Sequence, residues 1–83
     1  MTLITARRPN GLKFALPLDN LKVEVVFKPH DMHKFHVMAR GLSSVMYGES
    51  CLLKQCDTAD EVTRIIDDIE QAKKQHVDVD ISF

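Results

Sequence analysis

The stretch that decides the fold is TADEVTRIIDDIEQAKKQHVDVDISF, residues 58–83. Thr58 is followed three residues later by Glu61, which fits a capping box in which each residue satisfies a free amide of the other. Acidic residues in the first turn and two lysines near the end complement the helix dipole. The apolar residues recur at helical spacing on one face, at Val62, Ile65, Ile66, Ile69 and Ala72. The segment therefore begins with an amphipathic helix.

The tail after this helix alternates between apolar and polar residues, which is typical of a strand with one buried face. We expect that inner face to carry Val77, Val79, Ile81 and Phe83. Chain ends fray unless they are tied into a sheet. Four apolar side chains allow this tail to join either its own sheet or the sheet of a second copy.

The residues before the helix also alternate with period two, in several short runs. The clearest run has Leu21, Val23, Val25 and Phe27 on one face, so we expect a strand there. An earlier run has its apolar residues at Leu12, Phe14, Leu16 and Leu18. Because Pro17 has no amide hydrogen, that strand ends there or lies at a sheet edge. Further strands are expected at Leu3–Ile4, Phe35–Ala39 and Cys51–Cys56.

Turn residues separate these runs. Asn10-Gly11 after Pro9 is strong turn chemistry, because Asn and Gly tolerate positive φ. The order of strands, one helix and one strand predicts a single α+β domain over residues 1–83. We expect a mostly antiparallel, twisted sheet of five to six short strands, with the C-terminal-half helix packed on one face, then a final strand.

The charge is unevenly divided along the chain. Residues 1–41 carry seven Lys and Arg against three acids, whereas residues 42–83 carry four against nine. A nucleic-acid-binding regulator is one alternative function, because a basic sheet face can follow a phosphate backbone. Its candidate interaction residues are Arg7, Arg8, Lys13, Lys22 and Lys28. The near-neutral net charge of −1 and the acidic helix argue against strong affinity for nucleic acid.

Three histidines at i, i+3 and i+6 form the candidate metal site: His30, His33 and His36. Imidazole binds zinc, copper and nickel, so a metal-binding or metal-sensing domain is a second alternative. Against it, residues three apart do not share a face on a strand, and the Cys51–Cys56 spacing lacks the tight knuckle of a zinc site. A solvated loop with incidental histidines is the simpler interpretation, and we expect no cofactor.

Catalysis has weak support in the sequence. The candidate nucleophiles are Cys51, Cys56, Ser43 and Ser44, and no known nucleophile signature surrounds any of them. The carboxylate pairs Asp67-Asp68 and Asp78/Asp80 look like solvated surface rather than an acid–base dyad. We therefore expect that the protein is not an enzyme.

The sequence also predicts the compartment. No apolar run approaches the roughly 18 residues needed to span a bilayer, and the first residues lack the features of a signal peptide. Two cysteines without an export signal are best interpreted as reduced thiols. We expect a soluble cytoplasmic protein without membrane attachment.

RPNGLKFAL, residues 8–16, continued by Asp19 and Leu21, resembles the opening R-x-N-G-x-x-F-x-L of the small flagellar-regulator (FlbD-like) family. GESCLLK, residues 48–54, running into Asp60-Glu61-Val62, is similar to the family's G-x-x-x-x-V-x-E-S-x-x-E-V close. The resemblance covers about half of the chain, which differs in a longer middle segment and a C-terminal strand. It implies a small, non-enzymatic regulatory protein.

The leading hypothesis is a protein-interaction or regulatory module whose partner is not named by the sequence. Sheet edges expose unpaired amides and carbonyls, and a small core gains from an interface. We therefore expect binding through a sheet edge, the His30–His36 loop or the acidic helix surface, together with a homodimer.

Overall fold

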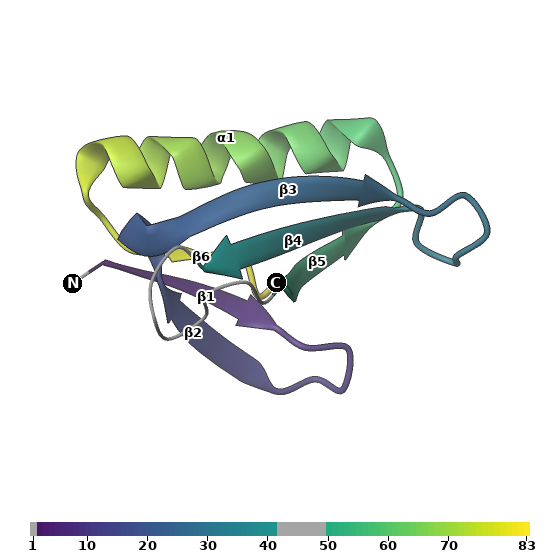
Figure 1. Cartoon of the computed structure of the whole chain (residues 1–83), viewed down its shortest axis with the longest axis horizontal. Helices are drawn as coiled ribbons and strands as arrows, with labels where there is room; N and C mark the ends of the chain where they lie inside the picture. The colour runs from purple at the N-terminus through teal and green to yellow at the C-terminus, as the bar shows by residue number, and fades with distance from the viewer. Residues whose placement is uncertain (1, 42–49) are drawn as a thin grey trace.

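The computed structural model describes residues 2–41 and 50–83 and has an α+β fold, as expected (Figure 1). Its elements are β1 (Leu3–Arg7), β2 (Lys13–Pro17), the 3-10 helix η1 (Leu18–Asn20), β3 (Leu21–Phe27), β4 (Phe35–Gly41), β5 (Ser50–Cys56), α1 (Ala59–Gln75) and β6 (Val79–Asp80). The helix and the strands expected before it lie at the predicted positions. The ambiguous segment Val45–Tyr47 and the candidate nucleophiles Ser43 and Ser44 lie outside the described residues.

The strands form two three-stranded sheets instead of one larger sheet. One has the order β2-β1-β6 and the other β3-β4-β5. All neighbours are antiparallel except β1 and β6, which are parallel. The division falls at η1, which begins directly after Pro17 and turns the chain away before β3 starts. Because β3 pairs with β4 and not with β2, it begins a second sheet.

The helix begins at the predicted capping residue and ends at His76. The hydroxyl of Thr58 accepts a hydrogen bond of 3.3 Å from the amide of Glu61, which satisfies one free donor of the first turn. At the other end, His76 adopts the left-handed conformation with φ of 55° and closes the last turn. Ile65, Ile69 and Ala72 are buried on the inner face.

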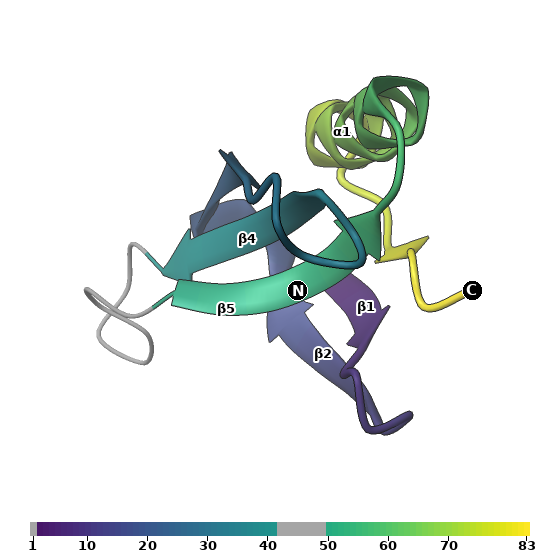
Figure 2. The same cartoon turned by 90° about the vertical axis from the view of Figure 1, so that its right-hand side faces the viewer.

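A single apolar core joins both sheets to the helix. α1 packs against β4, β5 and β6, and Figure 2, which looks along the helix, shows it above this side of the molecule. The buried apolar residues are Ile4, Ala6, Leu18, Leu21, Val37, Ala39, Leu53, Cys56, Ile65, Ile69, Ala72 and Ile81. Within the described ranges, no helix is long and apolar enough to cross a membrane.

The expectation for the tail is only partly correct. Ile81 is fully buried and Val79 is half-buried, but Val77 and Phe83 are exposed, Phe83 by 75%. The amide of Val77 is used to close the helix end through the carbonyl of Ala72. After β6 the chain bends, because Asp80 accepts hydrogen bonds from both the amide and the hydroxyl of Ser82. The apolar–polar alternation of the tail is therefore longer than the strand that it forms, which covers only Val79–Asp80.

Candidate functional site

β3 is the outer strand of its sheet, and among the described residues no strand pairs with its free side. The amide of Lys28 donates to the carbonyl of Lys34 at 2.7 Å, which fixes the phase of the β3–β4 ladder. In an antiparallel ladder the bonded positions alternate. The even-numbered residues of β3 therefore bond β4, and Val23, Val25 and Phe27 direct their amide and carbonyl groups outward.

The beginning of this outward side is already occupied. The amide of Leu21 donates to the carbonyl of Leu18, and the carbonyl of Leu21 accepts a hydrogen bond of 2.6 Å from Nζ of Lys73 on α1. No such contact reaches Val25 or Phe27 from the described part of the chain. We call residues 23–28, in which the backbone groups of the odd-numbered residues stay open, the β3 edge.

The β3 edge is also apolar. Val25, Val26 and Phe27 are consecutive and are exposed by 44%, 38% and 59%. The ring of Phe27 contacts that of Phe35 on β4, with ring centroids 5.3 Å apart. Three adjacent apolar residues on an unpaired strand are unusual, because soluble proteins normally protect such edges.

The alternation in the sequence places Val25 and Phe27 on one face of a strand together with Leu21 and Val23. The structure buries Leu21 and half-buries Val23, but it leaves the second half of this face open. The cause is the position of α1, which packs mainly on β4, β5 and β6 and bonds β3 at Leu21, the first residue of the strand. Val26 was the one sign in the sequence that this part of the strand is unusual. It is an apolar residue on the face that otherwise carries charged residues, so it breaks the strict alternation.

Charged side chains flank the apolar residues of the β3 edge. Glu24 and Lys28 lie two residues before and two residues after Val26, on the same face of the strand. Glu24 is about one-third exposed and lies 3.7 Å from the guanidinium of Arg40 on β4. At this distance and exposure the ion pair is weak, so the carboxylate remains available to another cation.

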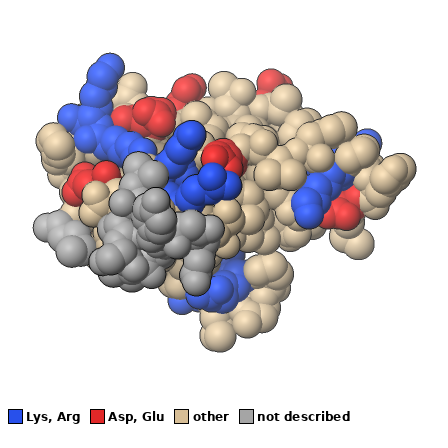
Figure 3. All heavy atoms as spheres, in the orientation of Figure 1, with Lys and Arg blue, Asp and Glu red and all other residues tan. Residues whose placement is uncertain are grey.

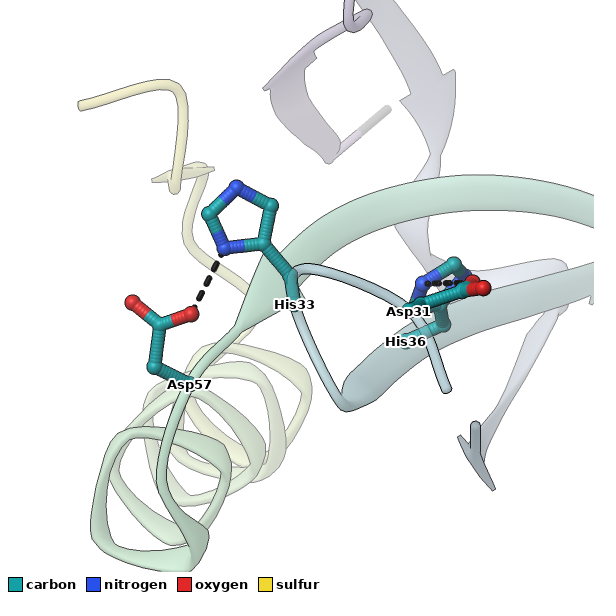
Figure 4. Close-up of polar contacts among 4 residues, drawn as sticks. All are labelled: Asp31, His33, His36 and Asp57. Atoms are coloured by element: carbon teal, nitrogen blue, oxygen red, sulfur yellow. Dashed lines mark hydrogen bonds and ion pairs between the residues drawn. The ribbon is translucent and has the colours of Figure 1, made fainter. Parts of the chain in front are cut away.

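The three histidines of the candidate metal site do not converge. Figure 4 shows His33 and His36 directed to different aspartates. Nδ1 of His33 lies 2.6 Å from Oδ1 of Asp57, whereas Nε2 of His36 lies 3.3 Å from Oδ2 of Asp31. His30 is exposed in the loop. Within residues 2–41 and 50–83, no group of three or more His, Cys, Asp or Glu side chains is placed to hold a metal ion.

The contacts of these histidines fit a structural role. His33 and Asp57 join the loop between β3 and β4 to the residue that precedes the helix cap. His36 is buried in β4 between Val26 and Gln55 of the neighbouring strands. Its Nε2 has no well-aligned hydrogen bond within the described residues, because the 3.3 Å contact to Asp31 has poor geometry.

The five candidate cations for nucleic-acid binding are divided between separate places. Arg7, Arg8 and Lys13 lie in and beside the β1–β2 hairpin, and Arg7 lies opposite Lys13. Lys22 lies opposite Arg40 at one end of the second sheet, and Lys28 lies at the other end. Figure 3 shows the cations of this face in several separate groups, with acidic residues among them.

Two cations of the hairpin, Arg7 and Arg8, also make contacts within the chain. Nε of Arg7 donates to the carbonyl of Ser82, and its Nη1 donates to the carbonyl of Gly11. The guanidinium of Arg8 lies 4.6 Å from the centre of the Phe14 ring. Arg7 therefore holds the hairpin to the tail, and Arg8 covers an aromatic face.

A pocket of about 220 Å³ lies between the hairpin, β5 and the tail. Arg7, Arg8, His33, Lys54 and Phe83 are among its lining residues. Nζ of Lys54 donates to the carbonyl of Phe83 and lies 4.7 Å from the centre of its ring. The polar groups of Arg7 and Lys54 in this pocket are thus bonded to the chain itself.

The cysteines and the carboxylate pairs do not form a reactive cluster in the described residues. Burial raises the pKa of the Cys56 thiol, and the charges of Glu61 and Asp57 raise it further while Lys54 opposes them. Such a thiol is a poor nucleophile at neutral pH.

Asp78 and Asp80 are exposed, as expected for solvated surface, and both carboxylates also bond the backbone. Oδ1 of Asp78 accepts from the amide of Leu3 at 2.8 Å, and Asp80 accepts from Ser82. The hydrogen bonds from the Ser82 hydroxyl and amide hold the pKa of Asp80 below its usual range. Both residues therefore fix the tail in place.

Three comparisons with known proteins returned no match for this chain: none with a family model, none with a curated protein and none with a solved structure.

Proposed function

We propose that this protein is a small, non-enzymatic interaction module that binds a protein partner by accepting a strand at the β3 edge. The observation that carries the proposal is the run Val25–Phe27, which combines exposed apolar side chains with outward amide and carbonyl groups. In strand addition, main-chain hydrogen bonds supply affinity, and side chains on alternate faces supply specificity. The β3 edge offers both.

A protein partner fits this surface better than a nucleic acid. The residues at the centre of the β3 edge are apolar, and a strand added there would bury them. Binding along a phosphate backbone depends instead on neighbouring cations, and the five candidate cations lie apart. The resemblance of residues 8–16 to small flagellar regulators points to the same class of regulatory binding protein.

The test is partner capture by the intact chain, with one substitution at the β3 edge and one matched control. Val25→Lys places a charge among the apolar side chains of the edge. Leu12→Lys makes the same change at another exposed apolar residue, in the β1–β2 hairpin. We expect the unaltered chain and the Leu12→Lys variant to retain the same bound protein from extracts of the source cells.

We expect the Val25→Lys variant to lose that protein while keeping its circular-dichroism spectrum. Retention of the same protein by the folded Val25→Lys variant would contradict the proposal, because the β3 edge would then not carry the binding. Loss by both variants would also contradict it, since the effect would not be specific to this edge.

A further inference from the structure

We infer that the partner fitted to the β3 edge is a second copy of this chain, paired antiparallel about a two-fold axis that passes through Val26. The inference rests on the proposed function and adds to it the occupant and the register. It follows from three features of β3: which residues direct their amide and carbonyl groups outward, where the charged residues lie along the strand, and which backbone groups at Leu21 are already bonded.

The backbone phase limits the possible registers. In an antiparallel ladder, residues directly opposite each other are either both bonded to one another or both unbonded. The outward groups of β3 belong to Val23, Val25 and Phe27, since the even-numbered residues bond β4. Two identical strands can therefore meet only with the axis at a residue, and not between two residues.

Like charges exclude two of these registers. With the axis at Val25, Lys22 of each copy lies directly opposite Lys28 of the other. With the axis at Glu24, the two Glu24 carboxylates lie opposite each other. Like charges directly opposite across a ladder destabilise the pairing.

Two more registers are unfavourable, because the backbone groups that they need are already bonded or do not exist. With the axis at Val23, Val25 would need the amide and carbonyl of Leu21, which Leu18 and Lys73 already occupy. With the axis at Phe27, Val25 would lie opposite Pro29, which has no amide hydrogen.

The axis at Val26 leaves only one of these conflicts, because Val23 then lies opposite Pro29, which is beyond the end of β3 and has no amide hydrogen. Val25 of each copy then exchanges two backbone hydrogen bonds with Phe27 of the other, giving four in total. Val26 packs on its own counterpart at the axis. Glu24 of each copy lies opposite Lys28 of the other, so both cross-strand pairs are of opposite charge.

Within residues 2–41 and 50–83, the fold leaves room for this arrangement. A two-fold axis perpendicular to the sheet places both helices on the same side of a continuous six-stranded sheet. Because α1 packs on β4, β5 and β6, each helix lies away from the joined β3 strands. The exposed Phe27 and Val25 side chains of the two copies meet on that side and are covered by each other.

Charge reversal tests the register in sedimentation equilibrium of the purified chain. We expect a monomer–dimer equilibrium. Lys28→Glu should weaken dimerisation about tenfold, because both opposite-charge pairs become like-charge pairs. Glu24→Lys should weaken it as well, although it also removes the contact with Arg40. The double variant Glu24→Lys with Lys28→Glu should restore the dimer, since each cross-strand pair is then again of opposite charge.

A cysteine placed on the axis gives a second, independent test. In a Cys51→Ser background, Val26→Cys should form an intermolecular disulfide on mild oxidation, because unbonded residues opposite each other bring their Cβ atoms close. Glu24→Cys in the same background is the control. Its counterpart lies four residues along the ladder, so no disulfide between two copies is expected.

The outcomes separate this inference from the proposed function. A chain that stays monomeric at high concentration, while Val25→Lys still loses a captured protein, would overturn the second copy and leave the proposed function standing. A dimer that is indifferent to Lys28→Glu, or that cross-links through Glu24→Cys and not through Val26→Cys, would overturn the register and with it the inference.

Discussion

Nζ of Lys73, near the end of α1, donates a hydrogen bond of 2.6 Å to the carbonyl oxygen of Leu21, the first residue of β3. This contact joins two residues 52 positions apart in the chain. It ties the helix to the start of the outer strand and occupies one of the acceptors at its free side. The part of β3 that follows keeps its outward groups open, so the same contact that stabilises the fold sets the limit of the β3 edge.

Replacing Lys73 tests this contact. Lys73→Met keeps the length of the side chain and removes the charged donor. We expect it to lower the free energy of unfolding by about 1.5–3 kcal/mol, the range for a hydrogen bond to a charged group. Urea denaturation measures the change. The control is Lys74→Met, which removes the same charge from the exposed next residue of the helix. Equal effects of the two variants would show that the helix dipole, and not the bond to Leu21, matters.

The position of the tail leads to a second prediction. Ile81 is fully buried, and its amide donates to the carbonyl of Thr5 at 2.8 Å, whereas Phe83 is largely exposed. Ile81→Ala should therefore lower the free energy of unfolding by about 2–5 kcal/mol, as is usual for a truncated core side chain. Phe83→Ala should change it by less than about 1 kcal/mol. A larger loss at Phe83 in thermal or urea denaturation would mean that the tail is buried as the alternation indicated.

Acid sensitivity is expected at Asp80. The hydrogen bonds from Ser82 lower its pKa in the folded protein, so the ionised carboxylate stabilises the fold at pH values above its pKa in the unfolded chain. That contribution is lost as the pH falls through the folded value. Asp80→Asn should be less stable than the unaltered chain at neutral pH, and the difference should shrink below about pH 4. Melting temperatures measured from pH 7 to pH 2 check this, and a constant difference would contradict it.

The two cysteines should react differently with a thiol reagent. Cys56 is fully buried, and burial raises the pKa of its thiol, so the reactive thiolate is disfavoured. Cys51 is half-buried at the sheet edge. Mass spectrometry after brief alkylation should find one modified cysteine, Cys51, in the native protein and two after denaturation. Early modification of Cys56 would show that the core around it opens readily.

Much of the fold is predictable from local patterns. Thr58 and Glu61 locate the helix start, and the turn at Asn10-Gly11 locates the first hairpin, because both depend only on neighbouring residues. The division into two sheets is harder to predict from the sequence. It depends on how η1 redirects the chain after Pro17, and alternation along a strand does not specify which strand becomes its neighbour.

The candidate site was only partly predictable. A sheet edge was one of the three surfaces expected to bind a partner, but the sequence pattern grouped Val25 and Phe27 on one face with Leu21, which is buried. Their exposure is a tertiary effect, since it depends on the strands that α1 covers. The spacing of the histidines was visible, yet the separate contacts of His33 with Asp57 and of His36 with Asp31 depend on loop geometry.

Amide hydrogen exchange on the intact chain, followed residue by residue at low and high protein concentration, tests most directly whether the β3 edge takes an added strand from a second copy. The account predicts that the outward amides of Val25 and Phe27 exchange fast when dilute and become protected on concentration. The amide of Lys28, which donates to Lys34 within the chain, should change little. Fast exchange of Val25 and Phe27 at every concentration would contradict the account.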